Sequence, residues 1–221
     1  MTDEPFNPFA SEDVSPPFAP HWEARRRLAQ AIRNLTELVV TTDPAIEEMG
    51  AVAAELEQQA ERLRAAPRLY GRMAFQEDGL HGGLPEVSHE LNAVGGWSNP
   101  LSPGMNIWIE GKRVHSSVTC NWAYEGPPEH VHGGFVAAIF DQFMGMAQIV
   151  AGQRGMTGRL TVRYHRPTPL NRELKLEAWE VKTEGRKTEM AAEMRLAGEV
   201  TATCEALFIA PKGGLNSIRQ Q

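Results

Sequence analysis

An almost wholly apolar run over residues 135–150 does most to limit what this chain can fold into. It follows His132-Gly133-Gly134, and one carboxylate, Asp141, interrupts it. A helix that is apolar all round is buried on every side, and an unpaired carboxylate is costly to remove from water. We therefore predict a buried helix here, with Asp141 as a candidate for catalysis beside a glycine-rich helix start.

The composition allows one core with an appendage, since the chain has 221 residues of which 42% are hydrophobic. Its net charge of −6 does not favour a nucleic-acid partner, which would need a basic face. We expect no membrane span, because we expect no apolar run to approach the roughly 18–20 residues that a span needs. The acidic, proline-rich start lacks the pattern of a signal peptide, so we expect a cytoplasmic location. Cys120 and Cys204 are then buried and reduced, with a disulfide as the open alternative.

The first 67 residues divide into an arm and a helical hairpin. Residues 1–20 contain five prolines and are expected to be extended or disordered. Residues 21–67 predict two helices, the first ending near Val40 and the second starting at Asp43-Pro44, where Asp caps the helix and Pro fits the first turn. Apolar residues recur three and four apart on one face of each helix: Leu28, Ile32, Leu35 and Val39, then Ile46, Met49, Ala53, Leu56, Ala60 and Leu63. This seam either packs on the main domain or a second subunit, or forms a lid or wall over a binding site.

Residues 68–98 predict a connecting loop, residues 99–212 the main domain, and residues 213–221 a tail. Six runs in the main domain are typical of strands: 106–110, 114–121, 159–166, 173–182, 187–196 and 199–210. We predict that the four strands after the helix form an antiparallel meander. One long helix against one curved antiparallel sheet of about six strands is an α+β fold. Such a sheet covers one side of the helix only, so we expect a second copy of the chain to cover the rest.

The start of the long helix has the chemistry of an oxyanion site. The first amides of a helix lack internal partners and carry partial positive charge, and glycine lets a ligand approach them closely. Asp141 follows Gly133 by eight residues, with small neighbours at Ala137, Ala138 and Gly145. In that setting an acid can serve as a general base or a nucleophile, while the alternative is a structural acid bonded to amides or to arginine.

The tripeptide alone means little, because His81-Gly82-Gly83 repeats it earlier in the chain. Leu84-Pro85-Glu86 follows that copy, which we interpret as a turn with no apolar helix after it. His130 and His132 alternate on an extended segment next to Glu129, but without a third clustered ligand we expect no metal.

With these motifs, the region from about Asn99 to Lys212 resembles the hotdog-fold acyl-CoA thioesterases of the 4HBT type, in particular the PaaI-like and thioesterase-superfamily-member-4-like branch. The matching residues are Gly126-Pro127-Pro128, His132-Gly133-Gly134, Asp141 and the run MTGRLTVRYHRPTPL at 156–170. Many PaaI-like enzymes carry Asn six residues before this His, where the present chain has Gly126.

The resemblance implies a helix wrapped by the sheet and a homodimer whose sheets join edge to edge, with two sites at the interface and a dimer of dimers as an alternative. Asp141 would act on the thioester carbonyl as base or nucleophile, and the Gly133 amide would hold the carbonyl oxygen. Thr157 would come from the other subunit to position water, and His132 would lie near the thioester.

The substrate would be acyl-CoA, with CoA as part of the substrate and no separate cofactor. Gly134, Arg163 and Arg166 are candidates for substrate binding, because Arg suits phosphate; the alternative for the arginines is an ordinary solvated strand face. Two other functions stay open on the same fold: a non-catalytic acyl-CoA-binding module that acts as a sensor or scaffold, and a hydratase or dehydratase.

Overall fold

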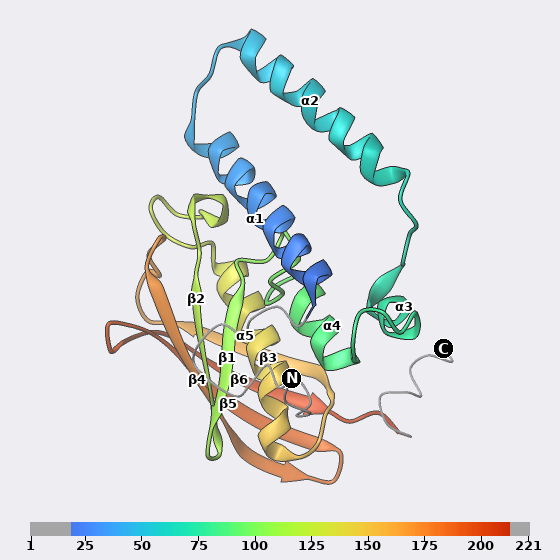
Figure 1. The fold of residues 1–221 in the computed structure, drawn as a ribbon. Coiled ribbons are helices and arrows are strands. Elements are labelled where there is room, and N and C mark those ends of the chain that lie inside the picture. The colour runs from blue at the N-terminus through green and yellow to red at the C-terminus, as the bar shows by residue number, and fades with distance from the viewer. Residues whose placement is uncertain (1–18, 213–221) are drawn as a thin grey trace.

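The computed structural model of the protein describes residues 19–212 (Figure 1). The predicted arm and tail therefore lie outside the described residues, except for Ala19 and Pro20. The helices are α1 (Pro20–Thr41), α2 (Ile46–Arg64), α3 (Gly71–Glu77), α4 (Leu84–Leu91) and α5 (Gly133–Ala147), with short 3-10 helices η1 (Trp122–Tyr124) and η2 (Gln148–Ala151). The strands are β1 (Met105–Glu110), β2 (Arg113–Thr119), β3 (Met156–Tyr164), β4 (Glu173–Glu184), β5 (Lys187–Leu196) and β6 (Glu199–Ile209).

The six strands form one antiparallel sheet in the order β1-β2-β4-β5-β6-β3. The predicted meander is right for β4, β5 and β6 but wrong for β3, which pairs with β6 at the edge of the sheet. The reason is the helix that precedes it: α5 carries the chain across the sheet, so β3 enters at the far edge and β4 returns to pair with β2. The curved sheet wraps α5 (Figure 1), which confirms the predicted α+β hotdog arrangement.

The core forms between the inner face of the sheet and one face of α5. Six side chains of α5 are buried against it: Val136, Ile139, Phe140, Phe143, Met144 and Ala147. The prediction that this helix is buried on every side is too strong for a single chain, because Ala137, Ala138, Asp141 and Gly145 are only half-buried. The expectation that no apolar run approaches the length of a membrane span was also wrong, since Gly133–Ala151 has 19 residues and a mean hydropathy of 1.4. Its place inside the sheet accounts for that apolarity.

The predicted connecting loop contains two short helices, α3 and α4. They form because their apolar side chains make a second small core with the start of α1, where Trp22 is fully buried against Phe75 and Val87. Helix α4 begins directly after Gly83, so a helix does follow the turn at His81-Gly82-Gly83, but it is short and amphipathic, unlike the long apolar α5.

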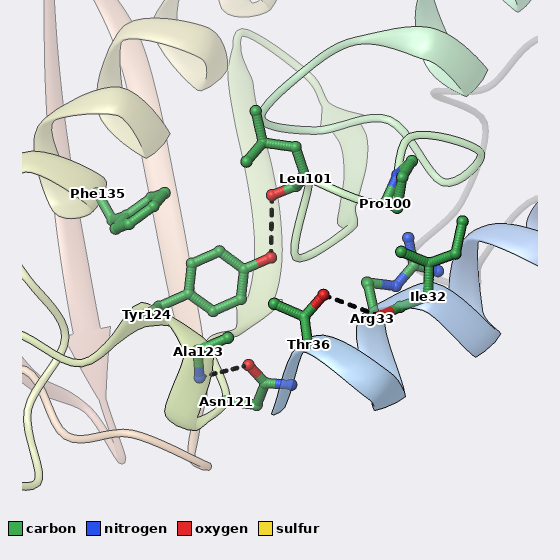
Figure 2. A pocket seen from close by; sticks show the side chains of 9 residues that line it. All are labelled: Ile32, Arg33, Thr36, Pro100, Leu101, Asn121, Ala123, Tyr124 and Phe135. Atoms are coloured by element: carbon green, nitrogen blue, oxygen red, sulfur yellow. Dashed lines mark hydrogen bonds between the residues drawn. The ribbon is translucent and has the colours of Figure 1, made fainter. Parts of the chain in front are cut away.

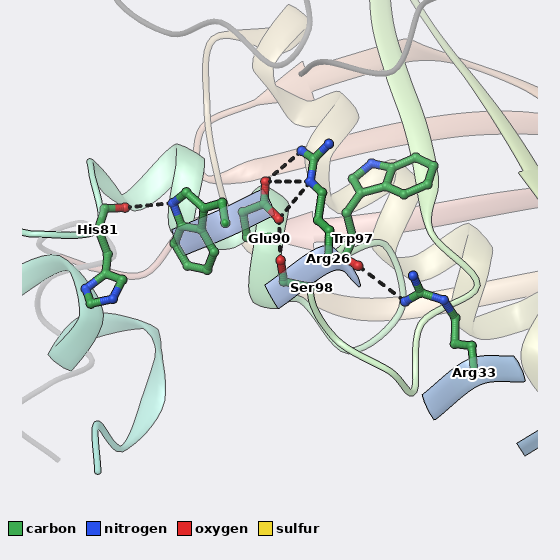
Figure 3. Close-up of polar contacts among 7 residues, drawn as sticks. Arg26, Arg33, His81, Glu90, Trp97 and Ser98 are labelled. Atoms are coloured by element: carbon green, nitrogen blue, oxygen red, sulfur yellow. Dashed lines mark hydrogen bonds and ion pairs between the residues drawn. The ribbon is translucent and has the colours of Figure 1, made fainter. Parts of the chain in front are cut away.

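Two arginines of α1 fasten it to this small core and to the loop that follows α4. The Arg26 guanidinium donates to the Glu90 carboxylate at 2.6 Å, and Ser98 Oγ donates to the same carboxylate at 2.6 Å (Figure 3). Arg33 Nη1 donates to the carbonyl oxygens of Trp97 and Asn99 at 3.3 and 3.1 Å. The bonds of the two arginines join residues more than 60 positions apart, so they fix α1 on the body of the protein.

Helix α2 differs from α1, because none of its residues is buried. It runs opposite to α1 and is joined to it by residues 42–45 (Figure 1). It starts at Ile46 after the uncapped Ala45, so Asp43 does not cap it as predicted. Residues 42–45 lie outside any helix, so the helix begins two residues later than the sequence indicated.

Candidate active site

The start of α5 leaves one backbone donor open. His132 is the N-cap residue, and its Nδ1 accepts a hydrogen bond from the Gly134 amide at 2.9 Å. The amides of Phe135 and Val136 donate to the His132 carbonyl. Within residues 19–212 the Gly133 amide donates to nothing, so it is the first-turn donor that remains available. The Gly134 amide, in contrast, is occupied by His132.

Tyr164 at the end of β3 lies against this opening. Its hydroxyl donates to the Gly133 carbonyl at 2.8 Å, and a Cβ built on Gly133 would meet the tyrosine ring at 3.5 Å, an ordinary contact. Only the alternation of Tyr164 with Leu160 and Val162 in the strand pointed to this residue, and it placed Tyr164 on the inner face. The tyrosine therefore positions the helix start without blocking its free amide.

Asp141 lies two turns further along α5 and is half-buried. Its Oδ1 accepts a hydrogen bond from Thr157 Oγ1 at 2.7 Å. Thr157 lies near the start of β3, where the pairing with β6 shifts register between Thr157 and Arg159. A bulge of this kind changes the direction in which side chains point. Here it lies next to Thr157, whose hydroxyl reaches Asp141 on α5. The resemblance implied that Thr157 acts from another subunit, but the structure brings it to Asp141 of its own chain.

The two halves of this arrangement are far apart along the helix. Eight residues separate Gly133 from Asp141, and at 1.5 Å per residue that is a rise of about 12 Å. One carbonyl group cannot contact both the Gly133 amide and the Asp141 carboxylate of a single chain. The Asp141–Thr157 pair and the Gly133 amide are therefore two separate features of one protomer.

A cavity of about 460 Å³ adjoins the free amide. Gly133 and Val136 line it from the helix, Tyr164 lines it from the end of β3, and Arg166 lines it from the segment after β3. Arg166 is exposed and pairs with Glu199 at 3.0 Å. Arg163 lines a different hollow on the outer face of the sheet, together with Trp179. The structure thus brings Arg166 to the start of α5 and leaves Arg163 away from it.

A second cavity of about 270 Å³ lies between α1 and the main domain (Figure 2). Its lining is largely apolar, with Ile32 and Thr36 from α1 facing Leu101, Tyr124 and Phe135. The Tyr124 hydroxyl donates to the Leu101 carbonyl at 3.0 Å, and burial raises the pKa of Tyr124 to about 12. Phe135 is in the first turn of α5, so this cavity begins on the opposite side of the same helix start.

The histidines near the helix start do not assemble a metal centre. His130 Nδ1 lies 2.7 Å from the Pro128 carbonyl, while His132 caps the helix. In the part of the chain that the structure describes, no three His, Cys, Asp or Glu side chains are grouped to hold a metal ion. Cys120 and Cys204 are free and buried, and burial raises the pKa of each thiol to about 12. The structure thus contains no disulfide between them.

Comparisons with known proteins agree with this geometry. The family model of the thioesterase superfamily matches residues 129–203, which include the start of α5, Asp141 and Thr157. Acyl-coenzyme A thioesterase THEM4 of Xenopus laevis is 35% identical over 87 residues, which are 38% of this chain and 39% of that protein. The chain thus spans about two fifths of the length of this curated relative.

One solved structure resembles most of the chain. It is described as a thioesterase superfamily protein, is 33% identical in sequence and superposes with a TM-score of 0.73. The match covers 88% of this chain and 97% of that one, so it extends beyond the sheet and α5 into the N-terminal helices. On this likeness, together with the matching family model, the chain belongs to the thioesterase superfamily.

Proposed function

We propose that this protein hydrolyses an acyl-CoA thioester to a free acid and CoA. The observation that carries the proposal is the Asp141–Thr157 pair on the half-covered face of α5, with an open amide at Gly133 on the same helix. A carboxylate that accepts a hydroxyl hydrogen bond at a half-buried position is suited to act on water or on a carbonyl carbon. Membership of the thioesterase superfamily supports the same chemistry.

In the proposed reaction, the thioester carbonyl oxygen accepts a hydrogen bond from the Gly133 amide at the positive end of the helix dipole. Asp141 either takes a proton from water as the water attacks the carbonyl carbon, or attacks that carbon itself and is released by water in a second step. The C–S bond breaks, the sulfur leaves as the CoA thiolate, and that thiolate takes up a proton. Thr157 holds the carboxylate of Asp141 in place, and His132 lies beside the carbonyl as the residue that shapes the helix start.

The site needs two copies of the chain. Because Gly133 and Asp141 of one protomer are about 12 Å apart along the helix axis, we infer that Gly133 of one copy faces the Asp141–Thr157 pair of the other. Two features favour such a homodimer: β3 is an edge strand with an unpaired side, and the Asp141 face of α5 is left partly uncovered. A dimer with joined sheets would contain two such sites.

Substrate recognition follows from the two cavities. Arg166 lines the cavity beside Gly133 and is our candidate for the CoA phosphates, with Gly134 close to the thioester. Arg163 keeps this role only if CoA crosses the outer face of the sheet. The acyl end is proposed to extend toward the apolar cavity that α1 borders, where Phe135 is two residues from Gly133. CoA enters as part of the substrate, and the cytoplasmic location stays a prediction.

The direct test is release of free thiol from a panel of straight-chain and aryl acyl-CoAs. We expect Asp141→Asn to lower kcat/KM by roughly 10²–10⁴, the usual contribution of a general base. Asp78→Asn is a matched control, because Asp78 lies beside the other His-Gly-Gly segment. If the wild type binds acyl-CoA and releases no thiol, the protein is a binding module. If Asp141→Asn is as fast as the wild type, the proposed role of Asp141 is wrong.

A further inference from the structure

Gln148 is buried at the point where α5 ends, and its side chain joins that helix to the start of β3. Only 2% of the residue is exposed. Its Nε2 donates to the carbonyl oxygens of Gly145 and Gly155, each at 3.2 Å, and its Oε1 accepts from the Gly155 amide at 2.6 Å. We call these three hydrogen bonds the Gln148 bridge. They use both N–H groups of the side-chain amide and its oxygen.

On the helix side, the Gln148 bridge holds the turn that follows Asp141. Gly145 comes four residues after Asp141, so the two residues lie on the same face of α5. The last carbonyl groups of a helix lack partners within the helix, and the Gly145 carbonyl receives a donor from Gln148. The bridge is therefore anchored one helical turn beyond the carboxylate.

On the strand side, the Gln148 bridge holds the residue from which β3 starts. Gly155 directly precedes β3, and Thr157 is the second residue of that strand. Gly155 is also pressed against the end of β6, because a Cβ built on it would lie 2.5 Å from the carbonyl carbon of Ile209. With Gln148 on one side and β6 on the other, Gly155 has little room to move. The position of Thr157, two residues further on, is set by this contact.

The Gln148 bridge thus joins the two elements that carry the proposed catalytic pair. Thr157 Oγ1 donates to Asp141 Oδ1 at 2.7 Å, and a lengthening of that distance by about 1 Å would end the hydrogen bond. We propose that Gln148 is a positioning residue that holds Thr157 against Asp141, an inference that rests on the hydrolysis proposed above. Gln148 touches neither side chain of the pair and acts on them through the backbone of Gly145 and Gly155.

A double-mutant cycle in the full chain tests the proposal by thiol release from acyl-CoA. Methionine is similar in length to glutamine but has no amide, so Gln148→Met removes the bridge. We expect it to lower kcat roughly tenfold to a hundredfold, as Thr157→Val does, with KM nearly unchanged. The double variant should match Thr157→Val to within about twofold, because the bridge acts through Thr157. Gln153→Met is the matched control and should keep the wild-type kcat, since Gln153 lies in the same connection and its Nε2 donates to Thr188 Oγ1 at 3.4 Å.

Crystal structures of the wild type and Gln148→Met give a reading that does not depend on activity. In the variant we expect Thr157 Oγ1 to lie beyond about 3.5 Å from the Asp141 carboxylate. If Gln148→Met does not fold, Gln148→Asn replaces it in both experiments, because its amide is one methylene too short to make all three bonds.

Three outcomes would overturn the proposal: an unchanged distance of 2.7 Å in the variant, a wild-type kcat in Gln148→Met, or losses of kcat that multiply in the double variant. Losses that multiply would mean that Gln148 supports the fold independently of Thr157. If the wild type releases no thiol and the distance still lengthens in the variant, the proposed hydrolysis is wrong while the positioning of Thr157 by Gln148 stands.

Discussion

The chain contains the tripeptide His-Gly-Gly twice, and the two copies differ in how they meet the helix that follows. At residues 81–83 the helix α4 begins after Gly83, which is its cap. At residues 132–134 the helix α5 begins two positions earlier relative to the tripeptide, at Gly133, with His132 as the cap. The same three residues therefore present different backbone groups to their surroundings.

The two segments have the same sequence but different hydrogen-bond partners. In the first, the His81 carbonyl accepts from Trp22 Nε1 at 3.3 Å, and the imidazole bonds Asp78 at 2.9 Å. Gly82 has φ of +80° and lies so close to the Glu86 carboxylate that a Cβ would collide with it. In the second, His132 is exposed and the Gly133 amide has no acceptor within residues 19–212. The first segment is thus tied into the small core around Trp22, whereas the second lies beside a cavity with Gly133 in its lining.

The first segment belongs to the small core that α1, α3 and α4 form, so changes near it should mainly affect the stability of the fold. We predict that Arg26→Ala lowers the free energy of unfolding by about 3–5 kcal/mol, the usual effect of removing one partner of a buried ion pair. The reason is that Glu90, whose side chain is 1% exposed, would keep an uncompensated charge. Thermal or urea unfolding measures this. The exposed Arg27→Ala is the control, and equal destabilisation by both changes would contradict the assignment.

The second segment should show its effect in catalysis. Gly133 is the first residue of α5, where proline is tolerated because its missing N–H has no helical acceptor. The extended backbone of His132, with ψ of 131°, also suits a following proline. We predict that Gly133→Pro keeps the fold and lowers kcat by about 10²–10³, the usual effect of losing one oxyanion donor.

Gly133→Ala is the matched control for this change, since it keeps the amide and its Cβ meets Tyr164 at an ordinary distance. Circular dichroism and thiol-release kinetics on both variants separate the two effects. A Gly133→Pro protein that is folded and fully active would show that the amide is not the oxyanion donor.

The part of the molecule that the sequence predicted best is the part with strict local patterns. Alternating apolar residues indicated the six strands to within a few positions, and the apolar run indicated α5. The position of β3 was not predictable in this way, because pairing with β6 depends on how α5 crosses the sheet. Helices α3 and α4 were missed because Gly and Pro around them are typical of loops, while Phe75 and Val87 gain their burial from Trp22, more than 50 residues away.

The candidate site was predictable as a set of residue types and less so as an arrangement. His132, Gly133 and Asp141 followed from the helix start and the lone acid. The contact between Thr157 and Asp141 occurs next to the bulge in β3, and that bulge leaves no clear signal in the residues themselves. The separation of Gly133 and Asp141 by about 12 Å follows from helix geometry alone. A site shared between two chains could therefore have been predicted from the sequence.

A change at Thr157 is expected to have a smaller effect on catalysis, and it tests the contact with Asp141 directly. We predict that Thr157→Val lowers kcat roughly tenfold to a hundredfold, because a hydrogen bond to a charged group is worth about 1.5–3 kcal/mol. Thr157→Ser keeps the hydroxyl and should stay close to the wild-type rate. Thermal unfolding of Thr157→Val distinguishes positioning from packing, since a positioning role lowers kcat without lowering the melting temperature. A wild-type rate in Thr157→Val would mean that the contact does not serve catalysis.

The smallest effect is expected at the cavity that α1 borders. This cavity is lined by Phe135, the residue that follows the second His-Gly-Gly segment. Ile32 is 37% exposed and lines this cavity, so Ile32→Trp should fill part of it. We predict a loss of roughly tenfold in kcat/KM for the longest acyl chains and little change for acetyl-CoA, since one methylene in an apolar pocket is worth about 1–3 kcal/mol. Leu38→Trp, on the same helix but outside the cavity, controls for added bulk on α1. If both variants keep the wild-type chain-length preference, the acyl end does not enter this cavity, and the open helix start at Gly133 must direct the substrate along the other side of α5.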